Sequence, residues 1–445
     1  MRSTSDPGEA SAMRIRTLSR MAKMSAIPLG VGRRMAVAGG LKALGRLTDE
    51  SSLKLHERTA DQLFEVLGGL KGGAMKFGQV LSVYETVLPP PISAVYRERL
   101  ARLQEAATPE DVRQVLEEDL GPAWQNLFAS FDDAPASAAS LGQVHRAVWR
   151  DGRPVAVKVQ YPDAREQLLG DRDLTIFAMR WFTSLIAPEL DGRALATDLM
   201  DRLAEELDYA QEAEAQTAFR AGFQADPDFV IPEVVHQQGR VLVSEWIDGT
   251  PLARIIAAGT QEQRDRAGLL LTRLMFAAIP RTGMMHGDPH PGNFRLFDDG
   301  RLGVLDFGAM YRHTPGTPSP FEKWMHIHLA ETPEELVRVL RELEFLRPGV
   351  RADGAELMEL FEHSGAPART ETFRFDGPYL RDTLAGMTSS MSVALSLAFP
   401  PDFVHAQRAM GVGIGVLCQL EAEVPFQQEA LRWLTESAEG DALSG

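Results

Sequence analysis

The chain has 445 residues, of which 44% are hydrophobic and 24% are charged, as in an ordinary globular protein. Its formal net charge of −16 argues against general nucleic-acid binding, so no nucleic acid is expected as a partner. Its single cysteine, Cys418, excludes an internal disulfide framework and indicates a reducing cytoplasm; because it lies in an apolar stretch, we expect a buried core thiol.

The first residues differ from the rest of the chain in charge. Residues 1–46 hold nine Lys and Arg against two acidic residues, a net charge of +7, which leaves −23 for the remainder. With apolar side chains among these charges, the segment is suited to peripheral contact with the anionic inner face of a membrane. The alternatives are a solvated basic tail and a tail that docks on the acidic body. The chain lacks both an apolar run of about eighteen residues and a convincing secretory signal, so we expect neither a spanning helix nor export.

Helical periodicity follows the basic segment. Leucines recur at helical spacing within residues 49–134, and Thr-Pro-Glu-Asp at 108–111 is a typical helix start. A small sheet with a long helical insert between its strand pairs is expected after this region. Its strands are predicted near residues 143–150, 153–160, 229–236 and 240–246.

The second predicted strand ends in a candidate phosphate-binding lysine. Residues 155–158 read Val-Ala-Val-Lys, the form of the third strand of a protein kinase, whose lysine contacts the α- and β-phosphates of ATP. Where a kinase has its glycine-rich loop, this chain is rich in alanine and serine, with Ala138, Ala139 and Ser140 as candidate nucleotide-binding residues. Because Cβ atoms limit how closely a loop approaches phosphates, we expect altered nucleotide handling.

A kinase lysine requires an acidic partner from a helix. Residues 198–220 are charged and periodic, and spacing alone does not choose among the acids there. The candidates are Glu205, Glu206, Asp208, Glu212 and Glu214. Further along, residues 245–249 (Glu-Trp-Ile-Asp-Gly) are interpreted as a hinge whose backbone, at Glu245 and Ile247, would meet adenine. Trp246 fits a core aromatic equally well.

The strongest signal lies at residues 286–308. HGDPHPGN at 286–293 is followed by Asp-Phe-Gly at 306–308. This is the order and spacing of a kinase catalytic loop, with Asp288, and of its metal ligands, Asn293 and Asp306. Mg²⁺ prefers hard oxygen ligands, and phosphoryl transfer needs such charge neutralisation as the terminal phosphate leaves.

At this point the chain resembles the UbiB/AarF/ADCK atypical kinases, over roughly residues 60–420. Residues 76–79 (Lys-Phe-Gly-Gln) look like the KxGQ signature of that family, and residues 138–145 look like its alanine-rich loop. Residues 206–209 look like its ExD motif, and residues 286–294 look like its catalytic loop. Few folds would require all four in this order.

The resemblance implies a role for each matched residue. Lys158 and Glu212 would form the ion pair that orders the phosphate site, and Asp288 would be the catalytic-loop aspartate. Asn293 and Asp306 would ligate Mg²⁺.

The resemblance also implies a regulatory extension. Lys76 and Gln79 would lie over the active site on an N-terminal helix, held by Glu206 and Asp208. Because this extension fills the groove for a protein substrate in the family, it implies ATP hydrolysis or phosphorylation of a small or lipid-like molecule.

The chain departs from the expected patterns at three places. Ser137 interrupts the alanine triplet, which leaves the nucleotide preference open. Gly287 stands where ordinary protein kinases carry Arg. No Ala-Pro-Glu follows Asp306, and residues 314–320 are short and rich in Pro, Gly, Ser and Thr, so a peptide-docking activation segment is not expected.

The predicted fold class is therefore α+β: a two-lobed, protein-kinase-like fold with a small β-sheet N-lobe, a mostly helical C-lobe and an added N-terminal helical extension. The boundaries follow from the predicted elements. We expect a basic segment at 1–48, the KxGQ extension at 49–134, the N-lobe at 135–249 and the C-lobe at 250–445.

Three functions compete. The first is a Mg²⁺-dependent, ATP-binding kinase or ATPase of the UbiB type, acting near isoprenoid quinone or lipid metabolism, where the pathway rests on resemblance alone. The second is a small-molecule phosphotransferase of the aminoglycoside or choline kinase type, which shares the His-Gly-Asp loop. The third is a nucleotide-binding regulatory scaffold. The KxGQ signature and the alanine-rich loop favour the first.

Overall fold

The computed structural model describes residues 111–138, 141–166, 168–169, 176, 193, 197, 200, 204–347, 349–389, 397–398 and 400–433. The chain divides into two compact units. One comprises residues 113–136, 144–159 and 208–445 and holds nearly all the described elements; we refer to it as the main unit. The other comprises residues 1–112, 137–143 and 160–207, and most of it lies outside the described residues. Each unit is considered by itself.

The main unit contains a small sheet with the strand order β1-β3-β4-β7-β6. The described pairs β1–β3, β4–β7 and β6–β7 are antiparallel. On β4, Val155, Val157 and Val159 are fully buried, so Lys158 between them lies on the opposite face. The strands are β1 (Phe128–Phe131), β3 (Gly142–Trp149), β4 (Pro154–Gln160), β6 (Val234–Gln238) and β7 (Val241–Glu245).

Two predicted elements of this region differ from the structure. Strand β1 lies within residues 49–134, which were expected to be helical, and its Phe128 and Phe131 rings pack edge-on to each other while Phe128 also meets Trp149. The single strand expected over 229–236 is split into β5 (Phe229–Val230) and β6, which belong to different sheets. Pro232 separates them, and proline lacks the N–H that a continuous ladder requires.

A second sheet presents the predicted metal ligands. Its order is β5-β11-β10-β8, with β5 and β11 parallel and the other pairs antiparallel. The hairpin of β10 and β11 starts just after Asn293 and ends just before Asp306. Its strands and their neighbours are β8 (Thr250–Pro251), β10 (Phe294–Leu296) and β11 (Leu302–Val304). A separate ladder joins β9 (Met284–His286) to β12 (Met310–Arg312).

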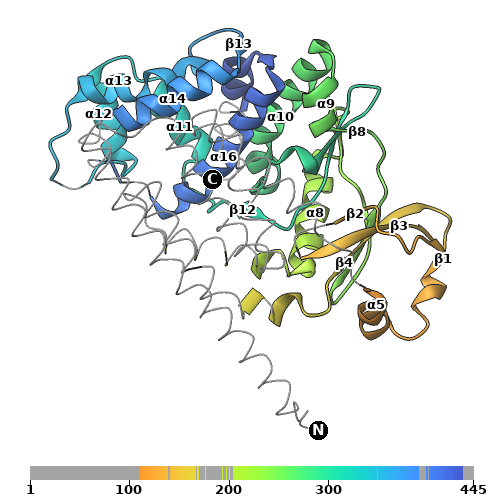
Figure 1. The fold of residues 1–445 in the computed structure, drawn as a ribbon. Coiled ribbons are helices and arrows are strands. Elements are labelled where there is room, and N and C mark those ends of the chain that lie inside the picture. The colour runs from red at the N-terminus through yellow and green to blue at the C-terminus, as the bar shows by residue number, and fades with distance from the viewer. Residues whose placement is uncertain are drawn as a thin grey trace, which may run out of the picture. The chain divides into compact units, whose positions relative to one another are not determined.

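Helices form the rest of the main unit and build its largest core. Helix α10 (Gln261–Thr282) begins with a capping box at Thr260 and Gln263 and ends at Gly283, whose φ of +68° suits the left-handed C-cap. It contacts α8 (Tyr209–Phe223) and α16 (Pro401–Leu420), while α12, α13 and α14 lie side by side (Figure 1). The remaining helices are α5 (Arg113–Leu120), α9 (Leu252–Ala258), α11 (Pro320–His328), α12 (Pro333–Glu342), α13 (Gly354–Gly365) and α14 (Gly377–Ser389).

Short elements complete the description. They are the 3₁₀ helices η2 (Trp124–Leu127), η3 (Pro291–Asn293) and η4 (Ala366–Ala368), and the strands β2 (Ser137–Ala138), β13 (Phe373–Arg374) and β14 (Glu423–Val424).

In the smaller unit, Gln160 Nε2 donates to Leu207 O at 2.8 Å and Tyr161 N donates to Leu141 O at 3.0 Å.

The thiol of Cys418 lies in the core, as predicted. It is on α16, and burial raises its pKa to about 12. Within the described ranges, no helix has the length and apolar character that crossing a bilayer demands.

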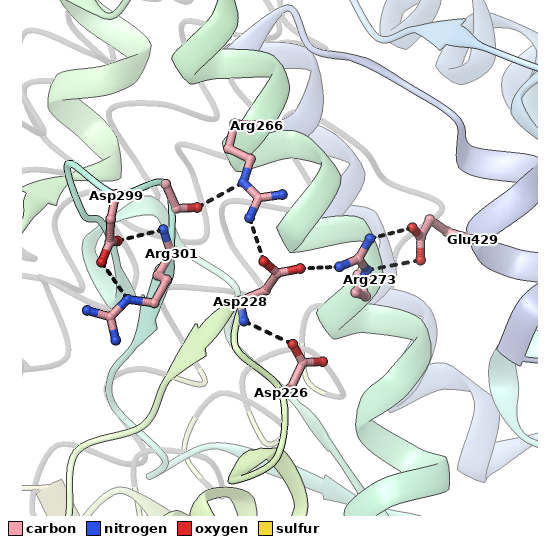
Figure 2. A network of polar contacts seen from close by, with 8 residues as sticks. Asp226, Asp228, Arg266, Arg273, Asp299, Arg301 and Glu429 are labelled. Atoms are coloured by element: carbon pink, nitrogen blue, oxygen red, sulfur yellow. Dashed lines mark hydrogen bonds and ion pairs between the residues drawn. The ribbon is translucent and has the colours of Figure 1, made fainter.

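A cluster of ion pairs joins distant parts of the main unit, and Figure 2 shows its centre. The Asp228 carboxylate accepts from Arg266 Nη2 at 2.6 Å and from Arg273, and Arg273 also binds Glu429. We call Asp226, Asp228, Arg266, Arg273, Arg281 and Glu429 the Asp228 cluster.

The Asp228 cluster fixes the end of α8 to α10. Arg281 on α10 donates to Asp226 at 2.8 Å, and its guanidinium lies 4.8 Å from the Phe223 ring and 4.7 Å from the Trp433 ring. Gly222 permits the close approach, because a Cβ there would lie 2.7 Å from Thr282 Cγ2. Three sequence regions far apart are therefore held together: the α8–β5 turn, α10 and residues 425–433.

Candidate active site

Lys158 and Glu212 form a close ion pair in the main unit. Lys158 Nζ lies 2.7 and 2.9 Å from the two carboxylate oxygens of Glu212 and 3.5 Å from Asp306 Oδ1. The ammonium also lies 5.2 Å from the centre of the Tyr209 ring, within cation–π range. Burial alone would lower the pKa of Lys158, but the carboxylates of Asp306 and Glu212 outweigh it and hold that pKa well above its usual value. The lysine is thus a fixed positive charge.

The N-terminus of α8 positions Glu212. Asp208 is the N-cap, and its carboxylate accepts from Gln211 N at 3.1 Å and from Gln211 Nε2 at 2.9 Å. Glu212 is in the first turn, where the helix dipole favours a carboxylate. About two turns further on, Phe219 is buried and anchors the same helix in the core.

The capping role of Asp208 was not predicted from the sequence, in which Asp208 was a candidate partner of Lys158 and a regulatory residue. A signal was present, because Asp208 and Gln211 stand three residues apart within the periodic residues 198–220, which is the spacing of an N-cap and its N3 residue. Tyr209, which lies against the Lys158 ammonium, was also missed, and no spacing rule would have identified it.

The Asp-Phe-Gly segment brings Asp306 to the ion pair. Asp306 has a φ of +57°, in the left-handed region that few non-glycine residues adopt and that often marks functional sites. Its Oδ1 accepts from Gly308 N at 3.2 Å. Phe307 turns the other way, is buried, and packs 5.3 Å from the Phe219 ring on α8.

Glycine at position 308 has a local reason. A Cβ there would lie 3.3 Å from both Asp306 Oδ1 and Glu212 Oε2. Position 308 therefore sits between the two carboxylates that flank Lys158.

The catalytic loop is held by its own backbone and by His286. Asp288 N donates to His286 Nδ1 at 3.3 Å, so Nδ1 is the acceptor and the proton lies on Nε2, which donates to Leu305 O at 3.1 Å. His286 thereby ties the loop to the strand end that precedes Asp306. Asp288 itself is half-buried.

Asn293 is oriented by the same loop. Its Nδ2 donates to Asp288 O at 2.9 Å, and its backbone O accepts from Leu305 N at 2.8 Å. Because the amide nitrogen is used in this way, the carboxamide oxygen is directed elsewhere, as a metal ligand requires.

Gly287 explains why an arginine is absent from this loop. A Cβ at position 287 would lie 2.8 Å from Ala309 O, and Gly287 N donates to that same oxygen at 2.8 Å. The loop packs against the segment after Asp-Phe-Gly too closely for a side chain.

The predicted hinge begins at Glu245, the last residue of β7. Trp246 N donates to Pro154 O at 3.0 Å and Glu245 N donates to Glu233 O at 2.9 Å. The Glu245 carboxylate accepts from Glu233 N at 2.9 Å, so this side chain supports the local structure and only main-chain atoms remain candidates for adenine.

Trp246 is not a core aromatic. It is half-buried, its Nε1 donates to Asp248 Oδ1 at 3.0 Å, and the Arg146 guanidinium lies 5.0 Å from its ring. The sequence left open whether Trp246 is a core residue, and its exposure excludes that interpretation.

The donor chemistry of the site fits Mg²⁺ bound with a nucleotide. Asp306 is 42% exposed and Asn293 offers an amide oxygen, which are both hard ligands. Among the described residues, no three His, Cys, Asp or Glu side chains cluster as a metal site. One carboxylate and one amide leave most of an octahedral shell to phosphate and water, which is the usual arrangement for Mg²⁺.

Some predicted site residues lie outside the described residues or in the smaller unit. Lys76, Gln79, Ala139 and Ser140 lie outside the described residues. Ala138 ends β2 in the smaller unit, and Glu206 is half-buried in that unit. Their roles stay predictions.

The small antiparallel sheet, the lysine–glutamate pair and the paired loops define a protein-kinase-like domain. Comparison with known proteins specifies it further: residues 101–334 match the family described as the ABC1 atypical kinase-like domain. The chain belongs to this ABC1 atypical kinase-like family, as its resemblance to the UbiB/AarF/ADCK kinases predicted, and the α+β, kinase-like fold class is confirmed.

Relatives include mitochondrial atypical kinases. The chain is 33% identical over 300 residues to atypical kinase COQ8B of Rattus norvegicus, which covers 66% of this chain and 56% of the relative. It is 31% identical over 317 residues to atypical kinase COQ8 of Saccharomyces cerevisiae, covering 68% and 61%. The match thus spans little more than half the length of these relatives.

A solved structure is also similar. The complex structure of Rv3197-erythromycin from Mycobacterium tuberculosis is 38% identical in sequence, with a TM-score of 0.63. The similarity covers 86% of this chain and 97% of that one.

Proposed function

We propose that the protein is an ATP-binding atypical kinase or ATPase that uses Mg²⁺. The observation that carries this proposal is the arrangement of Lys158 between Glu212 and Asp306, at 2.7 and 3.5 Å. A fixed cation held by one buried carboxylate and facing a second, exposed one is suited to a metal–phosphate ligand.

Each residue has a proposed role. Lys158 binds the nucleotide phosphates, and Glu212 orients the Lys158 side chain. Asp288 faces the acceptor. Asn293 and Asp306 would hold Mg²⁺. When bound, the ion would neutralise charge on the phosphates. The main chain at Glu245 and Ile247 would bind adenine, and residues 138–140 would lie against the phosphates. Lys76, Gln79, Glu206 and Asp208 are proposed as regulatory residues.

The acceptor is proposed to be water or a small or lipid-like molecule. In the described chain only residues 313–319 separate β12 from α11, which is short for a segment that docks a peptide. The names of the COQ8 relatives and their family support a role near isoprenoid quinone or lipid metabolism. The basic residues 1–46 support peripheral contact with the inner face of a membrane from the cytoplasm.

The test is Mg²⁺-dependent ATP hydrolysis by the purified chain, with and without anionic liposomes, beside Asp306→Asn. We expect the substitution to lower turnover by about 100-fold or more, because it removes the charge of a metal ligand. Equal turnover in both proteins would refute the metal assignment. Tight ATP binding without hydrolysis would favour a regulatory scaffold, and activity only with small hydroxylated or amine acceptors would favour a small-molecule phosphotransferase.

A second candidate function is binding of a macrolide. The observation in its favour is the 38% identity to a chain solved with erythromycin, across 97% of that chain. Calorimetric titration of the chain with erythromycin, with and without Mg-ATP, tests it. Absence of heat in both titrations would remove this candidate and leave the ATP proposal unaffected.

A further inference from the structure

The hairpin of β10 and β11 has one face in the core and one face toward the candidate site. Phe294, Leu296, Leu302 and Val304 are at most 4% exposed and pack in the large core. Because side chains alternate along a strand, the residues between them lie on the other face. That face carries Arg295, which is two positions after Asn293, the proposed metal ligand.

The hinge lies over the same face. Gly303 is paired with Arg295, and a Cβ at Gly303 would lie 2.8 Å from Ile247 Cδ1, so the Ile247 side chain covers this rung of the hairpin. Arg295 Nη1 lies 3.4 Å from Gly249 O, a long hydrogen bond. Gly249 has a φ of +112°, and its lack of a side chain lets the hinge backbone pack closely against Cβ of Arg295. Arg295 therefore lies under the hinge, two positions along the chain from Asn293.

We propose that Arg295 is a specificity-determining residue that contacts the base of the bound nucleotide. This proposal rests on the proposed function. A nucleotide with its base at residues 245–249 and its phosphates at Lys158 and Asn293 must cross the face that Arg295 occupies. A half-buried guanidinium is a planar cation that stacks on aromatic rings, so the base is the part of the nucleotide that it recognises.

The test compares two ligands that share phosphates but differ in the base. Equilibrium binding of Mg-ATP and of Mg-tripolyphosphate is measured for the full chain and for Arg295→Leu. We expect Mg-ATP affinity to fall by about tenfold and Mg-tripolyphosphate affinity to stay within about twofold, because only ATP offers a ring to the guanidinium. Arg295→Lys keeps the charge but loses the plane, so it should show most of the same loss for ATP.

A matched control is available on the same hairpin. Arg301 pairs with Asp299 at 2.8 Å near the turn, where both side chains are about half exposed. Arg301→Leu should leave the affinity for both ligands unchanged. Thermal unfolding of each variant verifies that it is folded.

The outcomes separate this proposal from the proposed function. An equal loss for both ligands, or no loss for ATP, would overturn the role of Arg295 while ATP binding by the unsubstituted chain stands. Full ATP affinity in Arg295→Lys would show that charge alone suffices and would overturn base stacking. If the unsubstituted chain binds no Mg-ATP, the proposed function itself fails.

Discussion

At the scale of single residues, the site depends on close contact between backbone segments and carboxylates as much as on charge. Gly287 and Gly308 stand where a Cβ would meet Ala309 O or the carboxylates of Asp306 and Glu212. The ion-pair lysine could be predicted from its motif, and the proposed metal ligands were likewise placed by theirs. The partner of Lys158 could not be chosen by spacing, because five acids share one helical region and only the fold decides which one faces β4.

Gly308 provides a prediction at this scale. In Gly308→Ala the new Cβ would lie 3.3 Å from both carboxylates, so Asp306 or Glu212 must shift by a few tenths of an ångström. We expect Mg-ATP turnover to fall by about tenfold, with little change in melting temperature, since such displacements at a reacting centre are costly. Steady-state kinetics and thermal unfolding measure the two effects.

The control for this substitution is Gly411→Ala. Gly411 is exposed on α16, and a Cβ there meets nothing within 4 Å. This variant should be fully active and slightly more stable, as alanine is the better helix former. Normal turnover in Gly308→Ala would contradict the role given to the glycine.

At the scale of helices and strands, hydrophobic and turn patterns located β3, β4 and β7 within one or two residues. The division of residues 229–236 between two sheets could not be predicted, because both halves carry strand-like residues and their partners come from distant sequence. Likewise, Phe128 and Phe131 form an edge strand only because β3 supplies Trp149 and His145 to pack against them.

Helices α11 and α13 are joined by a buried histidine whose titration predicts acid sensitivity. His328 Nδ1 lies 2.7 Å from Trp324 O and Nε2 lies 2.8 Å from Ser364 Oγ, and burial lowers the pKa of His328 from 6.5 to about 4. Between these two values the unfolded chain binds a proton that the folded chain does not. Stability is therefore complete above pH 6.5 and is lost as the pH falls toward 4.

We expect the free energy of unfolding to drop by about 2 kcal/mol from pH 7 to pH 5 through this group. Denaturant unfolding at the two pH values measures the drop. His328→Gln, which has no proton to gain in this range, should show a smaller pH dependence although its stability at pH 7 is lower. An equal drop in both proteins would assign the acid sensitivity to other groups.

At the scale of the main unit, the Asp228 cluster connects parts of the chain separated by more than two hundred residues. Asp228 also accepts from Leu302 N at 2.8 Å through its backbone, so the cluster supports the strand that leads to Asp306. No motif predicts it, because ion pairs of this kind depend on three-dimensional position. Glu429 is buried and the other members are half-buried: the Arg273 side chain is 16% exposed and that of Glu429 9%.

Asp228→Asn tests how much this cluster contributes to the stability of the fold. Replacing this half-buried carboxylate leaves Arg266 without its counter-charge and Arg273 with Glu429 alone, so we expect a loss of about 2 kcal/mol in the free energy of unfolding. Glu342→Gln breaks an exposed pair with Arg338 on α12 and should cost less than about 0.5 kcal/mol. Similar melting temperatures for the two variants would mean that the cluster contributes no more than a surface pair.

The position of Glu429 and Trp433 in the chain has a consequence for biosynthesis. A ribosome translates Lys158, Glu212, Asp288 and Asp306 long before it reaches these two residues. Until then Arg273 and Arg281 lack part of their partners, and the helix that carries Glu212 is held less firmly at its far end. The nascent chain is therefore expected to gain a stable candidate site only after residues 429–433 have been made, so that chains released before that point would be ready substrates for proteases.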